Sequence, residues 1–454
     1  MKLGLKMAEN RWVEPILAAL VLLTICHTIW HLVTYHYLPQ PFFYEPGDAW
    51  MDWFNTAYWA RDEGTYDVWG TVYPPLSFVF FKLVGIGACY PGAEGLDSRD
   101  CDWVGAIVMN AWCLLNALIF WKTYRKHDRS TALYRAFILA FGMPMADAWE
   151  RGNVIIVCFT CFILAHGPLL KSAKLKWLLA GLAVNFKVYL IASIVPYVLR
   201  RRWRWFEGAL ASVILIYVVT WGLLGRGNPV TLYENIVIFS QPMQATSFLD
   251  VWFAATYQPV ISLLNGMSTF PVMAILGSDR TEILIFLLPL ITHIVQATIV
   301  LAAAAAWLRP EVVPMYRLVG LITSLAIITS EPGGYTAVIV LMMALFERWE
   351  GIGRRIAIIC CYILSLQYDI YIDPLNPQLK AGFLGGQPVL YQYWVTVGPF
   401  LRPGLIMLIP FSLACVTLRA VWLDIRAQGW RNRYRFRYDA PLLTEGGAKQ
   451  SSIA

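Results

Sequence analysis

The sequence predicts an all-α, polytopic membrane protein with about 12 transmembrane helices, some of them broken or re-entrant. Apolar and aromatic residues make up 58% of the 454 residues and charged residues 14%, whereas soluble proteins average about 45–50% and about 25%. Several stretches carry almost no charge and approach the roughly 20 residues that cross about 30 Å of hydrocarbon as a helix; they are 15–37, 207–224, 283–307 and 403–421. This composition excludes a disordered chain, a basic domain that binds nucleic acid and an ordinary soluble two-domain enzyme.

The distribution of charge indicates which side of the membrane each loop faces. Short cytoplasmic loops are rich in Lys and Arg; such loops lie at 122–129, 171–176, 200–204, 348–355 and 419–437. Acidic and aromatic loops alternate with them, at 39–72, 91–102, 146–153, 226–247, 331–335 and 371–387. We therefore expect the second group on the outer (periplasmic) face, both termini in the cytoplasm, and an uncleaved signal anchor at the N-terminus. The lack of an Asn-x-Ser/Thr site favours a bacterial plasma (inner) membrane.

Two segments do not fit simple spanning helices. Residues 73–90 open with Tyr73-Pro74-Pro75, and a crossing there would place the later basic loops outside, so we expect a re-entrant or interfacial segment. Residues 175–199 lie between two basic clusters and are too long for one helix but too short for two. We expect a helix that rises to about Lys187 and a short, broken return through Pro196, which is tolerated where protein or a water-filled cavity shields the backbone.

The first outer loop holds the residues best suited to chemistry. Asp48 and Asp52 are four residues apart, so both carboxylates would lie on one face of a helix. Trp50, Trp53 and Tyr58 alternate with these charges, as is typical of a helix that lies at the membrane interface under a cavity. For either carboxylate alone, a solvated loop with ordinary caps is the alternative.

Three cations lie in or beside apolar segments: Arg151, Lys187 and Arg402. A charge inside the membrane costs at least ~2.5–3.5 kcal/mol even on insertion scales, so it usually faces the protein interior with a partner. Each of the three could instead snorkel or form a structural ion pair. Together they would suit a lipid phosphate, because Arg and Lys both bind phosphate oxygens. The turn at Glu331 could line a site or simply connect two helices.

Cys89 and Cys101 flank a loop that we place outside, and no other cysteine lies near it. We predict a disulfide between them, which only an oxidising compartment would allow. The six histidines show no metal-ligand spacing, so no metal site is expected.

Three motifs resemble those of GT-C-type integral membrane glycosyltransferases that use a polyprenyl-phosphate sugar. The first runs from Asp52 through the 63–67 turn to Tyr73-Pro74-Pro75-Leu76. Arg151-Gly152-Asn153 and the 181–189 segment around Lys187 resemble two motifs of the glycosylphosphatidylinositol mannosyltransferases that add the first mannose. Bacterial polyprenyl-phosphate-mannose-dependent mannosyltransferases share a looser form of this layout. Trp50 stands where the eukaryotic enzymes have the first Asp of Asp-x-Asp, and beyond residue 205 only the hydropathy agrees.

The resemblance implies a single GT-C-like transmembrane domain. Its catalytic module would be 1–205, followed by further transmembrane helices at 206–422 and a cytoplasmic basic tail at 423–454. Such enzymes transfer mannose, or another hexose or pentose, from a polyprenyl-phosphate donor to a hydroxyl of a glycolipid or glycan acceptor. The transfer is a single displacement that inverts the anomeric carbon, and on this account it needs neither a metal nor another cofactor.

We expect Asp52 to act as the general base, with Asp48 as the second choice. The expected substrate-binding residues are Lys187 and Arg151 for the phosphate, Trp50, Trp53 and Tyr58 for stacking on sugar, and Asn153, Tyr73 and Glu331 beside them. The competing class is a polytopic transporter or a flippase of lipid-linked sugars, which would also have intramembrane charges and broken helices. The long first outer loop and the absence of visible internal repeats argue against that class.

Overall fold

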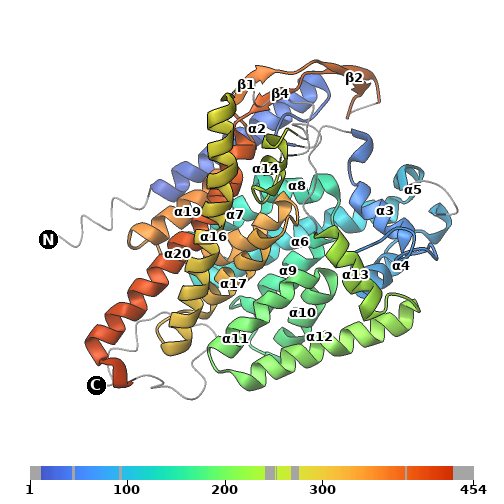
Figure 1. Ribbon diagram of the computed structural model, residues 1–454. Helices are drawn as coiled ribbons and strands as arrows, with labels where there is room; N and C mark the ends of the chain where they lie inside the picture. The colour runs from blue at the N-terminus through green and yellow to red at the C-terminus, as the bar shows by residue number, and fades with distance from the viewer. Residues whose placement is uncertain are drawn as a thin grey trace.

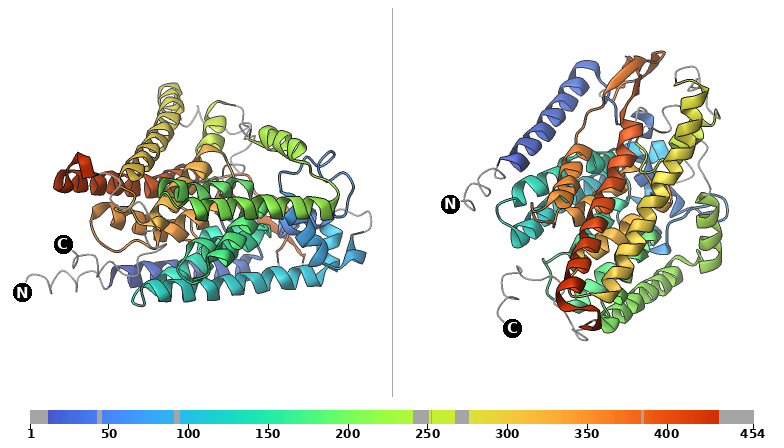
Figure 2. Two further views of the ribbon diagram at one scale, coloured as in Figure 1. Left: turned by 90° about the horizontal axis from the view of Figure 1, so that it is seen from below. Right: turned by 60° about the vertical axis from the view of Figure 1, so that its left-hand side comes forward.

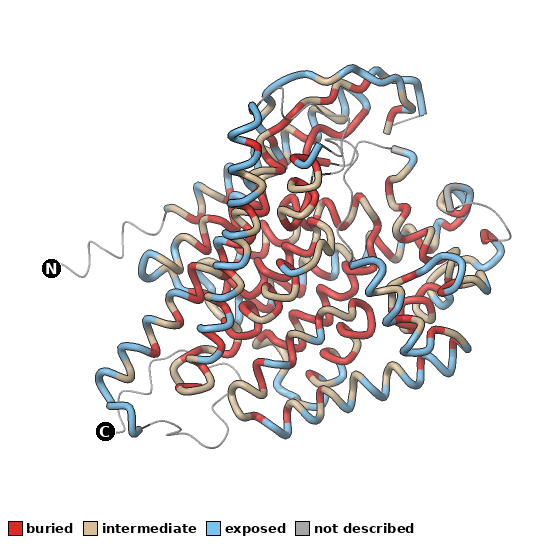
Figure 3. The backbone as a smooth tube through the Cα atoms, viewed as in Figure 1, coloured by how far each residue is buried: buried red, intermediate tan, exposed pale blue. Residues whose placement is uncertain are grey.

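The computed structural model is built mainly from α-helices. It describes residues 12–42, 46–90, 95–240, 251, 253–266, 276–383 and 386–432. Figure 1 shows the helices packed side by side, with short strands at one end of the bundle. Buried residues gather in the middle of this bundle, and exposed residues follow its outer helices (Figure 3).

Five long outer helices identify the chain as a membrane protein. They are α2 (Val13–Tyr35), α6 (Trp103–His127), α12 (Trp203–Leu224), α16 (Ser278–Leu308) and α20 (Gly398–Gln428), each long and apolar enough to cross a bilayer. In the first four, only 17–22% of the most apolar window is buried. Because a soluble protein rarely exposes large continuous apolar patches, these faces are the lipid-facing surface. Among the described residues, only these five helices are both long enough and apolar enough to cross a membrane. The predicted count of about 12 crossings is therefore not established.

Shorter apolar helices fill the centre of the bundle. α9 (Ile155–His166) and α18 (Ala337–Ala344) bury nearly every residue, as expected of helices that are apolar all round. Around them pack α7 (Ala132–Phe141), α10 (Ala173–Phe186), α17 (Met315–Thr329) and α19 (Ile352–Leu364). The core therefore lies among helices that the outer five screen from lipid.

The remaining elements are short and mostly cap the bundle. The α-helices are α3 (Met51–Trp59), α4 (Pro75–Leu83), α5 (Gly95–Cys101), α8 (Met143–Arg151), α11 (Val195–Leu199), α13 (Pro229–Phe239) and α14 (Gln258–Leu264). The 3₁₀ helices are η1 (Pro46–Asp48), η2 (Gly87–Cys89), η3 (Val188–Ile194), η5 (Gly334–Thr336) and η6 (Trp430–Asn432).

The strands of the described chain begin in the predicted loop at 371–387, which contains β1 and β2, and continue beyond it with β3 and β4. β1 (Tyr371–Pro374) pairs antiparallel with β4 (Trp394–Thr396), and β2 (Gln378–Ala381) pairs with β3 (Pro388–Tyr391). These two small sheets lie at the end of the bundle where α2 ends (Figure 2). They leave the fold essentially all-α, as predicted.

The structure agrees with both expected departures from plain spanning helices. α4 has nine residues, which at 1.5 Å per residue is far short of the membrane thickness, so residues 73–90 do not form a spanning helix. The second segment breaks at Lys187, which ends α10 and begins η3, and it returns through η3 and α11. Pro196 stands at the first turn of α11, where its missing N–H costs no hydrogen bond.

The predicted disulfide is present. Cys89 and Cys101 are joined, with their Cα atoms 5.5 Å apart. Beside it, the buried carboxylate of Asp102 accepts hydrogen bonds from the backbone N–H of Ile86 and from the Tyr90 hydroxyl. The disulfide and these bonds fix α5 against the segment that follows α4.

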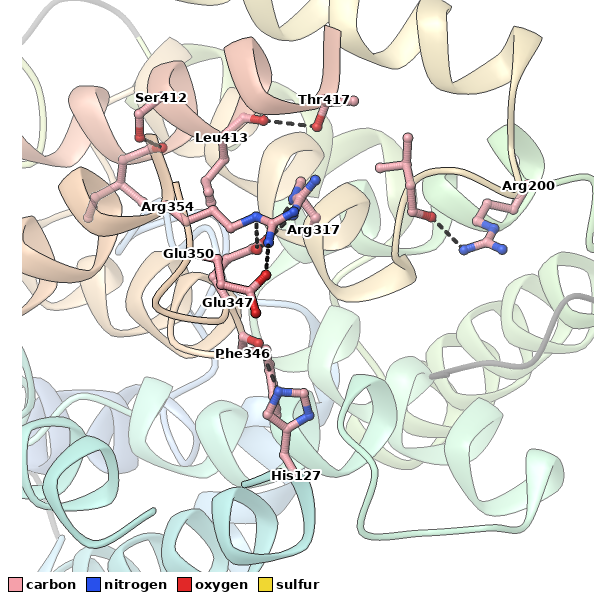
Figure 4. Close-up of polar contacts among 12 residues, drawn as sticks. His127, Arg200, Arg317, Phe346, Glu347, Glu350, Arg354, Ser412, Leu413 and Thr417 are labelled. Atoms are coloured by element: carbon pink, nitrogen blue, oxygen red, sulfur yellow. Dashed lines mark hydrogen bonds and ion pairs between the residues drawn. The ribbon is translucent and has the colours of Figure 1, made fainter. Parts of the chain in front are cut away.

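Several buried arginines inside the bundle are paired with carboxylates. Arg317 donates two hydrogen bonds to Glu347, at 2.5 and 2.6 Å, and both side chains are almost fully buried. Arg354 approaches the same carboxylate at 3.4 Å and reaches Glu350 at 3.3 Å (Figure 4). Arg135 likewise forms a bidentate pair with Glu14. Breaking one partner of such a pair is costly because the other charge stays buried.

Replacing Arg317 by Met should therefore destabilise the fold by roughly 3–5 kcal/mol, because Glu347 loses its bidentate partner. Arg354→Gln is the matched control: this side chain contacts the same carboxylate but is partly exposed, so its loss should cost at most about 1 kcal/mol. Thermal unfolding of the two purified variants in detergent measures the difference. Equal losses would show that burial does not determine the strength of this network.

Candidate functional site

The first outer loop is fastened to the end of α8 through its backbone. Trp50 has a left-handed backbone (φ 64°), and its N–H donates to the carbonyl of Glu150 at 2.7 Å. Gly152 also has a positive φ, and a Cβ there would lie 2.8 Å from the Cα of Trp50. Only glycine allows this close approach without strain, so the Arg-Gly-Asn sequence is needed to bring α3 and α8 together.

At this junction Arg151 binds both candidate carboxylates. Its guanidinium donates to Asp48 through one terminal nitrogen and to Asp52 through the other, the second bond being 2.9 Å long. Asn153 donates to the second oxygen of Asp52 at 2.8 Å. Burial alone would lower the pKa of Arg151, but the charges of Asp52 and Asp48 outweigh burial and raise it. We call Asp48, Asp52, Arg151 and Asn153 the Asp52 cluster.

The disulfide-linked segment supports this cluster from outside. Arg99 in α5 donates to the carbonyls of Gly47 and Ala49, at 3.3 and 3.1 Å. These carbonyls lie on either side of Asp48, so α5 fixes the turn that presents its carboxylate. The cysteine pair thus contributes to the geometry of the candidate site.

Lys187 approaches the same place from the break between α10 and η3. Its ammonium lies 4.3 Å from the ring centroid of Tyr73 and 5.6 Å from that of Tyr335. The hydroxyls of both tyrosines lie within 3.3 Å of the Asn153 amide nitrogen. Two aromatic rings therefore connect Lys187 to the Asp52 cluster, and both contacts are cation–π interactions.

The Lys187 ammonium has no carboxylate partner among the described residues, although only 8% of the residue is exposed. Arg402, by contrast, pairs with Asp369 at 2.6 Å, and the buried Lys176 ammonium, which also has no carboxylate partner in the described chain, donates to the carbonyl of Gly167 at 2.8 Å. Arg402 is thus a structural ion-pair residue. Lys187 carries its charge at a buried position where an anionic ligand would supply the missing partner.

Two residues of this site escaped the sequence analysis. Asp147 is buried on α8, one turn before Arg151, and accepts a hydrogen bond from the backbone N–H of Tyr335. Tyr335 itself reaches Asn153 and Lys187 from η5. The spacing of Asp147 and Arg151 at i,i+4 was the available signal, whereas nothing local distinguished Tyr335 from other loop tyrosines.

Other predicted residues have positions unlike those expected. Trp53 is 1% exposed and packs edge-on against Phe81 with centroids 4.8 Å apart, so its ring has no free face for a sugar. Glu331 accepts bonds from the N–H groups of Ala255, Thr256 and Gly333, and thereby braces a loop rather than facing the cluster. The structure therefore does not bring the Trp53 ring or the Glu331 carboxylate to the cluster, because packing determines where an interfacial side chain points.

Of the two remaining aromatic candidates, Trp50 lies beside the cluster and Tyr58 does not. Trp50 packs edge to face with Trp149, centroids 5.7 Å apart. Tyr58 packs against Trp69 at the far end of α3. Of the predicted residues, Asp48, Asp52, Arg151, Asn153, Tyr73 and Lys187 are brought together, with Trp50 as part of the wall. In the described chain no group of three His, Cys, Asp or Glu side chains is arranged to hold a metal ion.

Comparison with protein-family models, with curated proteins and with solved structures finds no significant match to this chain.

Asp147 should make stability depend on pH. Burial raises its pKa to about 7, above the ordinary value of 3.8, and Arg151 opposes this rise. A raised carboxyl pKa favours the folded protein at low pH, and this contribution is lost as the pH rises toward and through 7. Asp147→Asn, which stays neutral, should thus gain thermal stability relative to the unmodified protein between pH 5 and pH 8. A difference in melting temperature that does not change with pH would contradict the assignment.

Proposed function

We propose that this protein is an inverting glycosyltransferase that moves a sugar from a polyprenyl-phosphate donor to a hydroxyl of a glycolipid or glycan acceptor. The observation that carries the proposal is that a buried Lys187 ammonium without a carboxylate partner in the described chain is connected, through Tyr73 and Tyr335, to the cluster that holds Asp52. The ammonium is suited to bind a phosphate, and the carboxylate is suited to accept a proton. They come from segments more than 130 residues apart in the chain, so their meeting is a property of the fold.

Asp52 would be the general base. Each of its oxygens already accepts one hydrogen bond, from Arg151 and from Asn153. Because a carboxylate offers about four lone-pair sites, it can still accept the proton of an acceptor hydroxyl. The two donors hold its orientation, which is the preorganisation that catalysis needs. Its side chain is 23% exposed, so an acceptor can reach it.

Lys187 would bind the phosphate of the donor. In the displacement, the acceptor oxygen attacks the anomeric carbon, its proton passes to Asp52, and the bond from that carbon to the phosphate oxygen breaks. The electron pair leaves with the polyprenyl phosphate, and the Lys187 charge stabilises the negative charge that develops there. Tyr73 and Tyr335 keep the ammonium in place without neutralising it.

The membrane topology belongs to the same proposal. We infer about 12 crossings, both termini in the cytoplasm, and the Asp52 cluster on the outer face of the inner membrane. The Cys89–Cys101 disulfide supports this side, because disulfides persist in the periplasm and rarely in the cytosol. Shorter apolar helices, such as Ile155–His166 and Met315–Thr329, supply crossings beyond the five long helices.

Asp52→Asn should lower the transfer rate by at least about 10²-fold, because an amide cannot accept the hydroxyl proton. Initial rates would be measured in detergent with polyprenyl-phosphate-linked mannose, glucose, galactose and arabinose. Asp97→Asn, an exposed carboxylate on α5, is the matched control and should keep full activity. Asp48→Asn should reduce the rate less than Asp52→Asn.

Donor binding and thermal stability of Asp52→Asn must be checked separately, since the change also removes one ionic contact of Arg151. Full activity of both Asp52→Asn and Asp48→Asn would show that neither carboxylate takes part in the reaction. An inactive Asp48→Asn with an active Asp52→Asn would show that Asp48, not Asp52, is the general base. A transporter would leave all four donors unhydrolysed and untransferred in detergent.

Lys187→Met should weaken use of the donor by roughly 10²-fold at limiting donor concentration, since one charge-assisted contact to phosphate is lost. Methionine keeps an unbranched stem beside the Tyr73 ring, so the fold should tolerate it. Lys174→Met, at an exposed position of α10, is the control and should have no effect. Normal donor efficiency in Lys187→Met would leave this lysine with a structural role only.

A further inference from the structure

A second concave site lies at the end of α2, outside the Asp52 cluster. It is a cavity of about 290 Å³, close to the lower size limit of small-molecule sites. Its wall is formed by the last turns of α2, the segment that follows, and the strands β1 and β4 (Figures 1 and 2). Most of the lining side chains are aromatic, and they include His27, Trp30, His31, Tyr371, Tyr393 and Trp394.

The lining contains no charged side chain. None of the twelve lining residues is Asp, Glu, Lys or Arg. A phosphate would find no cation here, and an ammonium ion would find no carboxylate. The lining therefore offers no ion-pair partner to an anion, and only ring faces to a cation.

The cavity is nevertheless polar along its edges. The Nδ1–H of His31 donates to the carbonyl of Tyr37 at 3.0 Å, and because a carbonyl can only accept, the neutral imidazole keeps Nε2 as an acceptor. A hydrocarbon chain would leave this nitrogen unpaired, whereas a hydroxyl group would pair with it.

Aromatic faces complete the match to a sugar. The rings of Tyr371 and Trp394 lie 5.6 Å apart with a tilt of 33°, which forms one continuous wall. The C–H bonds on the face of a sugar ring carry partial positive charge, and the face of an aromatic ring is negative. Rings for the C–H face and imidazole nitrogens for the hydroxyls are the two kinds of contact that a neutral sugar makes.

This cavity is also tied to the segment that leads to the Asp52 cluster. Gln40 exchanges two hydrogen bonds of 2.8 Å with the backbone of Trp394. Asp48 is eight positions after Gln40, which limits the distance between their Cα atoms to about 29 Å for extended chain. A glycan of several sugars could thus occupy the cavity with one residue and present another to Asp52.

We propose that the cavity at the end of α2 binds an uncharged sugar residue of the glycan acceptor, remote from the hydroxyl that reacts. Its role as an acceptor subsite rests on the proposed glycosyltransferase function, whereas sugar binding by the cavity does not. Trp394 is the residue to test, because its backbone makes the contacts with Gln40 and only its ring faces Tyr371.

Binding would be measured by saturation-transfer NMR on the full-length Asp52→Asn protein in detergent, with the methyl glycosides of mannose, glucose, galactose and arabinose as probes. At least one should bind, and adding Trp394→Ala should weaken it about tenfold, the value of one aromatic contact. Trp394→Phe should restore binding. Trp422→Ala, an exposed tryptophan near the other end of α20, should leave it unchanged.

Binding of none of the four glycosides, equal binding to Trp394→Ala, or binding of choline chloride in their place would overturn the proposal. In the otherwise unmodified protein, Trp394→Ala should raise the KM for a glycan acceptor about tenfold and leave kcat and the donor KM unchanged. Sugar binding that depends on Trp394 in a protein that transfers no sugar would reject the glycosyltransferase function and keep the cavity as a sugar site.

Discussion

The contact between Arg151 and the two aspartates of the first outer loop determines how the outer end of this protein is arranged. One guanidinium holds Asp48 and Asp52 together, and the backbone bond from Trp50 to Glu150 fixes the same junction. Without that cation, two carboxylates would repel each other at a place with little water. With it, α3, α8 and the disulfide-braced α5 form one rigid frame, against which Tyr73, Tyr335 and Lys187 are positioned.

Pairing is the general rule for charge inside this bundle. Arg135 with Glu14, Arg317 with Glu347 and Arg402 with Asp369 all bring opposite charges within 3 Å. The first pair joins α2 to α7, and the other two tie a helix to a loop residue, Arg317 of α17 to Glu347 and Arg402 of α20 to Asp369. Removal of either partner would leave a charge in a dry interior. The two buried lysines lack a carboxylate partner in the described chain: Lys176 donates to the Gly167 carbonyl instead, whereas the Lys187 ammonium lies against the rings of Tyr73 and Tyr335. That contrast is the reason for the role proposed for Lys187.

The two sites at the outer end have opposite chemistry. The Asp52 cluster is ionic and holds its carboxylates in fixed orientations, whereas the cavity beside α2 is uncharged and lined by rings. The proposed enzyme would join a charged lipid donor to a neutral glycan, and it would need both kinds of surface. The short segment after α2 forms part of the cavity wall, and the chain continues from it to Asp48 of the Asp52 cluster.

Hydropathy and charge determined from the sequence alone that the chain is helical and lies in a membrane, because long uncharged runs have no other stable environment. The break at Lys187, the non-spanning 73–90 segment and the cysteine pair were also predicted, since each depends on residues close together in the chain. Only the tertiary structure decided which side chains meet. Trp53 and Trp50 belong to one short pattern, yet one enters the core and the other lines the junction. The positions of Asp147, Tyr335 and Glu331 depend on contacts with residues at least 75 positions away in the chain. Hydropathy does not predict such contacts, because it indicates whether a residue is buried from water but not which residue it contacts.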